Sequence, residues 1–159
     1  MSNRIVAVTV LAAALGAMVS PSWSDSGAFV GQWHWNRSAS TVAPDEPLPR
    51  DVVLKIGAAD ASRIQWTLTT VDSQGEQHVE SYSGAGDRKP VAIAGGPEGT
   101  TGVFTLAGDT LEGSYANQDG SSDRSSCTVS ADRKKMTCHG TESDGKGHSM
   151  DYVDVYDRQ

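Results

Sequence analysis

The chain has 159 residues and a formal net charge of −7 at pH 7. That length leaves room for one domain, and the negative charge argues against a nucleic-acid partner because it repels phosphate. Few leucines and no helical periodicity after residue 24 disfavour a helical core.

The first 24 residues have the features of a secretory signal peptide. Arg4 precedes an uncharged run over 5–19, and Ser22 and Ser24 supply the small residues of a cleavage site. The run is too short for a membrane span, and no second one follows, so we expect no span. We therefore predict a periplasmic or secreted protein whose single domain covers 25–159.

That domain is poor in large apolar side chains. Only 21 of its 135 residues are Leu, Ile, Val or Phe, about 16%, whereas disorder becomes a serious interpretation below roughly 20%. The apolar residues alternate, however, and a one-layer closed sheet needs only every second strand residue to be apolar. The alternation is clearest in three sets: Val52, Leu54 and Ile56; Ile64, Trp66 and Leu68; and Tyr152, Asp154 and Tyr156, with Val153 and Val155 opposite.

In chain order the pattern predicts ten strands, separated by turns rich in Gly and Asp. Between the first two strands, the segment Ser40–Arg50 carries three prolines and should form an extended connection. The expected strands are 28–35, 51–58, 63–71, 76–83, 89–94, 101–106, 110–117, 124–130, 135–142 and 148–156.

An antiparallel sheet of this size must protect the unpaired backbone groups of its edge strands, and closing the sheet into a barrel removes those edges. We predict an all-β fold: a single antiparallel, mostly meander barrel of about 8–10 strands. A two-sheet β-sandwich is the alternative. The interior of such a barrel holds either packed side chains or one small ligand.

The two cysteines, Cys127 and Cys138, flank a short turn over 131–134. If Ser130 pairs with Lys135, the same antiparallel register places the cysteines opposite each other, at a separation that suits a disulfide. Export favours oxidation. We therefore predict a structural bridge, because the spacing is not that of a redox Cys-x-x-Cys motif.

Gly31-Gln32-Trp33 resembles the Gly-x-Trp element that opens lipocalin barrels. More widely, the chain is similar to a family of small secreted bacterial lipocalin-like proteins of unknown function. The resemblance implies a barrel with a ligand cavity, and it implies that Trp33 packs against a basic side chain at the closed end, where Arg158 is placed to match. The shared elements are Gly31, Trp33 and Asn36; Pro44, Pro47 and Pro49; and Val153, Val155 and Tyr156.

Large side chains in the strands are the candidates for ligand contact, because ligand sites are mostly apolar with a few polar groups. Plain core packing is the alternative for the same side chains. The candidates are Trp33, Trp35, Trp66, Leu68, Phe104 and Tyr115.

Catalytic and metal motifs are missing from the sequence. No two of the four histidines have a metal-ligand spacing, and there is no nucleophile elbow. We therefore predict no catalytic residue, metal or cofactor. Asp154 and His78 are the only modest candidates for an inward-facing acid or base.

Three functions remain open. The leading one is an exported barrel that binds a small hydrophobic or amphipathic ligand. The second is a periplasmic protein-binding module, such as a hydrolase inhibitor, that would use the Ser40–Arg50 loop or acidic turns. The third is an isomerase or cyclase that works inside the barrel.

Overall fold

The computed structural model describes residues 26–41 and 47–159, so the predicted signal peptide and Pro44 lie outside the described residues. None of the described residues forms a helix that is long and apolar enough to cross a membrane. After one 3-10 turn, η1 (Ser26–Ala28), the strands are β1 (Gly31–Trp35), β2 (Asp51–Ala59), β3 (Ile64–Val71), β4 (Gln77–Gly84), β5 (Val91–Ala92), β6 (Thr101–Ala107), β7 (Thr110–Ala116), β8 (Ser122–Val129), β9 (Lys135–Ser143) and β10 (Ser149–Arg158).

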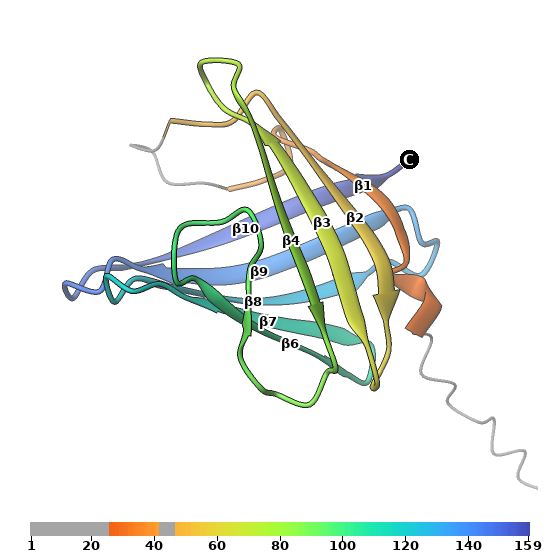
Figure 1. Cartoon of the computed structure of the whole chain (residues 1–159). Coiled ribbons are helices and arrows are strands. Elements are labelled where there is room, and N and C mark those ends of the chain that lie inside the picture. The colour runs from red at the N-terminus through yellow and green to blue at the C-terminus, as the bar shows by residue number, and fades with distance from the viewer. Residues whose placement is uncertain (1–25, 42–46) are drawn as a thin grey trace, which may run out of the picture.

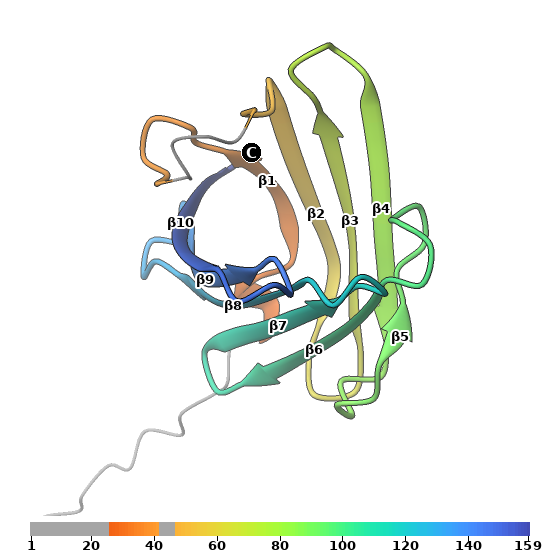
Figure 2. The same cartoon turned by 90° about the vertical axis from the view of Figure 1, so that its left-hand side faces the viewer.

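These strands form one antiparallel sheet in the order β4-β3-β2-β1-β10-β9-β8-β7-β6-β5. The first and last strands pair, with Trp33 opposite Arg158 and Trp35 opposite Tyr156. Strands β2–β4 run across β6–β9 in Figure 1, and Figure 2 shows the sheet curling from one group to the other through β1 and β10. The predicted meander barrel is confirmed, and the single ten-stranded sheet excludes the sandwich.

The barrel closes at a seam between the two end strands, β4 and β5. Just beyond β5, Ala94 exchanges two backbone hydrogen bonds with Ser81 of β4, at 2.9 and 3.0 Å. Gly95 allows this approach, because its φ is +83° and a Cβ there would collide with the Val79 carbonyl. The predicted strand 89–94 shrinks to Val91–Ala92, because the chain then leaves β6 to pair with β4.

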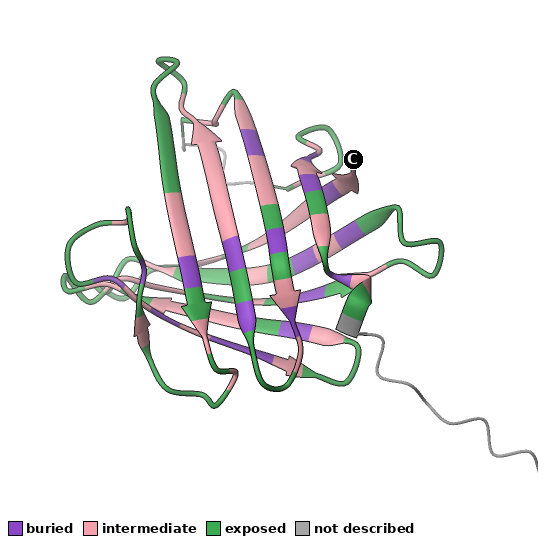
Figure 3. Cartoon of the chain, turned by 45° about the vertical axis from the view of Figure 1, so that its right-hand side comes forward, coloured by how far each residue is buried: buried purple, intermediate pink, exposed green. Residues whose placement is uncertain are grey.

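Burial follows the predicted alternation. In β3, for example, Ile64 and Trp66 are buried whereas Gln65 between them is exposed, and the same bands are visible along the strands in Figure 3. Hydrophobic burial is most complete at one end of the barrel. The largest side chains that are fully buried are Trp33, Phe29, Ile56, Ile64 and Met136.

Trp33 and Arg158 close that end. The Trp33 side chain is 0% exposed, and its indole N–H donates to the Phe29 carbonyl oxygen at 2.8 Å. The Arg158 guanidinium carbon lies 4.1 Å from the centroid of the Trp33 ring, a cation–π arrangement. Arg158 also donates to the carbonyl oxygens of Ala28 and Val30. The contact that the lipocalin resemblance implied is therefore present, although β1 begins at Gly31 rather than at residue 28.

The predicted disulfide is also present. Cys127 of β8 and Cys138 of β9 are directly opposite each other and are bonded. The turn has the expected register, because the Ser130 amide donates to the Lys135 carbonyl oxygen at 2.8 Å. Both sulfur-bearing side chains are buried, so the bridge ties β8 to β9 from inside the barrel.

Replacing both cysteines by Ala should lower the free energy of unfolding by about 2–3 kcal/mol, as expected for a short disulfide loop. Urea unfolding curves of the variant and of the wild-type protein measure this loss. Wild-type protein unfolded in the presence of reductant is the control and should lose a similar amount. Equal stability of the oxidised and reduced proteins would contradict the structural role.

Candidate functional site

The barrel encloses a cavity of about 500 Å³. Its walls are formed by the inward-facing side chains of the strands, and Leu48 and its flanking prolines close part of the mouth. A second depression of about 1000 Å³ lies on the outer face of β6–β10, where most of the lining side chains are polar. Ligand sites are mostly apolar and concave, so the interior cavity is the better candidate. Its aromatic lining consists of Trp35, Trp66, Phe104, Tyr115, Tyr152 and Tyr156.

Four rings form a continuous cluster on one side of this interior. Trp66 stacks on Tyr82 at 5.9 Å between ring centroids, and Phe104 packs edge-on against Trp66 at 5.3 Å and against Tyr82 at 4.7 Å. Tyr115 extends the cluster, 5.3 Å from Phe104. These rings come from β3, β4, β6 and β7, so they join the strands on both sides of the seam.

Trp66 has an unsatisfied polar atom within this cluster. Its side chain is 4% exposed, and its indole N–H finds no acceptor among the described residues. Buried polar groups are usually hydrogen-bonded, and each exception calls for an explanation. Because Trp66 is part of the cavity wall, a bound molecule with an oxygen acceptor could satisfy this donor.

The charged part of the cavity lining consists of carboxylates. Tyr152 donates its hydroxyl to the Asp123 carboxylate at 2.9 Å, and the Trp35 indole N–H donates to Asp154 at 2.8 Å. Burial raises the pKa of Asp123, and the charge of Asp154 raises it further. Burial also raises the pKa of Asp154. The protein thus keeps two acidic groups where their charged forms are disfavoured.

Two more carboxylates face the same space. Glu142 of β9 lies directly opposite Asp123 of β8 and also lines the cavity. Glu80 of β4 lines it as well, and burial raises the pKa of Glu80. Asp123 and Glu142 also border a smaller hollow of about 400 Å³ at the same end of the barrel, beside Asp144 and His148. The open end of the interior is therefore acidic.

A strand glycine allows Tyr152 to reach Asp123. Tyr152 is on β10 and Asp123 is on β8, so the ring must cross β9, where the partner of Tyr152 is Gly140. A Cβ at Gly140 would overlap the Tyr152 ring. The absence of a side chain at Gly140 therefore permits the bond between the tyrosine and the carboxylate.

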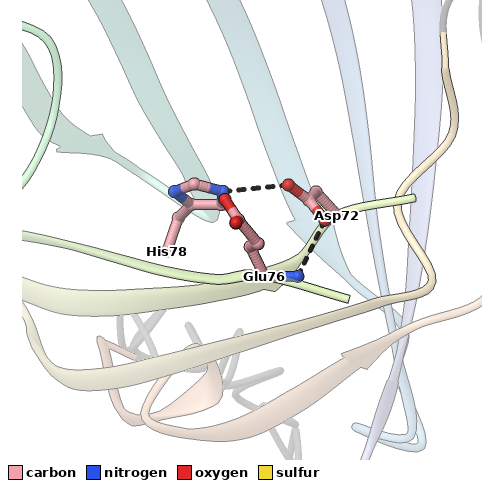
Figure 4. Close-up of side chains that lie close together, drawn as sticks. All are labelled: Asp72, Glu76 and His78. Atoms are coloured by element: carbon pink, nitrogen blue, oxygen red, sulfur yellow. Dashed lines mark hydrogen bonds and ion pairs between the residues drawn. The ribbon is translucent and has the colours of Figure 1, made fainter. Parts of the chain in front are cut away.

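The histidines lie elsewhere. His78, one of the two predicted acid–base candidates, is exposed, and its Nε2 atom lies 3.2 Å from Asp72 in the β3–β4 turn. Together with Glu76, these residues place three side-chain atoms that could ligate a metal ion within 4.8 Å of one another (Figure 4). Asp72 already accepts backbone amides from Gln74, Gly75 and Glu76 through its other oxygen, so turn formation accounts for the group.

The predicted ligand contacts divide into two sets. Trp33 is sealed at the closed end and does not line the cavity, whereas the other five do: Trp35, Trp66, Leu68, Phe104 and Tyr115. Asp154, the other predicted acid–base candidate, lines the cavity as well.

The ligand contacts predicted from the sequence did not include Asp123, Glu142 or Tyr152. Asp123 could have been found, because period two places it on the same face as Cys127. Tyr152 could have been found in the same way, because it alternates with Tyr156. Their mutual bond depends on an empty space above Gly140, which no spacing reveals.

Comparison with protein-family models gives no match, and comparison with curated proteins gives none either.

Replacing Gly140 by Ala should displace the Tyr152 ring and break its bond to Asp123, at a cost of about 1–3 kcal/mol for overpacking. Urea unfolding and the near-ultraviolet circular dichroism of the tyrosines would measure the change. Gly57→Ala in β2 is the matched control, because a Cβ at position 57 would meet its nearest neighbour at an ordinary van der Waals distance of 3.8 Å. Equal effects of the two substitutions would contradict the proposed role of Gly140.

Asp154→Asn should raise the urea midpoint at pH 7. The folded-state pKa of Asp154 is raised above its ordinary value of 3.8. The carboxyl therefore contributes stability that is present below that value and is lost as the pH rises through the raised pKa. An Asn at this position keeps an oxygen that accepts from the Trp35 indole N–H. Because its side chain does not ionise, it does not lose stability as the pH rises. The advantage of the variant should shrink as the pH falls towards 3.8, and a midpoint below that of wild type at pH 7 would refute the argument.

Proposed function

We propose that this protein is an exported, lipocalin-like barrel that binds one small amphipathic ligand in its interior. The observation that carries the proposal is the cavity of about 500 Å³, whose walls combine aromatic rings with a few polar groups. Pockets of roughly 300–1,000 Å³ with that mixture are typical of small-molecule sites.

Two further features support a binding role. The closed end is filled by fully buried side chains, whereas the cavity side chains Leu68 and Tyr115 are only partly buried. The barrel therefore has a packed half, which supplies stability, and a less completely filled half. The disulfide between Cys127 and Cys138 supports export, because such bonds persist in oxidising compartments.

Acid–base catalysis in the same cavity is the second candidate. The observation that favours it is the pair Asp123 and Asp154, since carboxyl groups with raised pKa values in a cavity are typical of acid–base sites. The two functions predict different outcomes. A binding protein returns its ligand unchanged, whereas an enzyme converts it and loses the conversion when either Asp becomes Asn.

A bulky residue at the cavity mouth should block binding of an apolar probe. Thr70 of β3 lines the cavity, whereas Thr69 beside it does not. We expect the neutral dye N-phenyl-1-naphthylamine to bind the wild-type protein at one site with increased fluorescence. Thr70→Trp should weaken this binding about tenfold or more, a loss of about 1.4 kcal/mol.

Thr69→Trp is the matched control, because it adds the same side chain to the opposite face of the strand. It should bind the dye as the wild-type protein does. Equal binding by all three proteins would place the dye outside the barrel, and no binding to any of them would argue against the proposed function.

A further inference from the structure

We propose that the ligand is an organic cation: a protonated amine on an aromatic-sized apolar body that also carries an oxygen acceptor. This inference rests on the proposed function and names the ligand class for the same cavity.

The cavity lining carries charge of one sign only. Four carboxylates line it, and none of its described lining residues is Lys, Arg or His. Asp123 and Asp154 are partly buried. A partly buried carboxylate is costly to keep charged, and a cation that enters the site offsets that cost. The four come from four different strands and converge on one space: Glu80, Asp123, Glu142 and Asp154.

The protein does not neutralise the two best-buried acids itself. The hydrogen-bond partners of Asp123 and Asp154 include an uncharged hydroxyl and an uncharged indole, respectively. Neither carboxylate forms an ion pair with a basic side chain in the part of the chain that the structure describes. An ammonium group on the ligand would supply the missing opposite charge.

The register adds a like-charge pair. Asp123 and Glu142 are directly opposite each other on neighbouring strands, and both line the cavity. Like charges in that arrangement destabilise a sheet. A cation held near both carboxylates would reduce the repulsion between them.

Aromatic rings border the same acids. Trp35 is bonded to Asp154, Tyr152 is bonded to Asp123, and both rings line the cavity. The face of an aromatic ring attracts an ammonium group, and the attraction grows when the site is desolvated. Carboxylates and aromatic rings that line one cavity together therefore suit an amine better than a neutral polar group.

Trp66 supplies an independent indication of a ligand. Its side chain is more than nine-tenths buried, it forms part of the cavity wall, and its N–H has no acceptor among the described residues. An ammonium group cannot satisfy this donor, because it has no acceptor of its own. The ligand must therefore bring a hydroxyl, ether or carbonyl oxygen in addition to its charge.

Isothermal titration with three matched probes tests the inference. Each probe is a 6-methoxynaphthalene that carries an ethylamine, an ethanol or an acetic acid group at position 2. The three share one apolar body and one ether oxygen, and the group at position 2 is positive, neutral or negative at pH 7. We expect the amine to bind with a stoichiometry of one, about tenfold or more tighter than the alcohol, with the acid weakest.

Variants locate the amine. Asp154→Asn and Asp123→Asn should each weaken amine binding severalfold and leave the alcohol unchanged. Asp151→Asn is the matched control, since Asp151 is exposed, belongs to the same strand as Asp154 and bonds Thr141 instead of lining the cavity. It should leave the affinity for all three probes unchanged.

Each outcome has a distinct meaning. If the alcohol or the acid binds as tightly as the amine, the cation inference fails while the proposed ligand-binding function stands. If the amine prefers the wild-type protein but both cavity variants retain full affinity, the amine binds elsewhere and the inference also fails. If none of the probes binds, both proposals fail.

Discussion

The barrel depends on a seam between two sheet edges that few backbone hydrogen bonds hold together. Between β4 and the chain after β5, the backbone pairing among the described residues is one residue pair, Ser81 with Ala94. The rings of Trp66, Tyr82 and Phe104 compensate, because they pack against one another across that seam. Aromatic pairs contribute roughly 0.5–1.5 kcal/mol each beyond their burial, so this cluster keeps the barrel closed and gives the cavity a rigid wall.

Closure at the seam divides the interior into two halves with different chemistry. At one end, Trp33 is sealed under Arg158 and the side chains are fully buried. At the other end, Asp123, Glu142 and Asp154 face a cavity. The cavity carboxylates add little packing energy, so the closed end, the aromatic cluster and the disulfide supply most of the stability.

Most of the architecture could be predicted from the sequence because period-two alternation and Gly–Asp turns are local signals. The ten strands and the pairing of Cys127 with Cys138 followed from them. The exception, the short β5, arises because Ala94 pairs with a distant strand. The bond between Tyr152 and Asp123 was missed for a similar reason. It depends on the empty space above Gly140, which lies between two strands that only the fold brings close together.

The register of strand β10 decides which of its side chains face the cavity. A slip of one residue would turn Val153 and Val155 inward and would turn Tyr152, Asp154 and Tyr156 outward, because such a slip exchanges the two faces of a strand. The slip is prevented at the end of the strand, where Arg158 lies over Trp33 and Tyr156 pairs with Trp35. The interactions that fix the register therefore also place a carboxylate, rather than a valine, in the cavity.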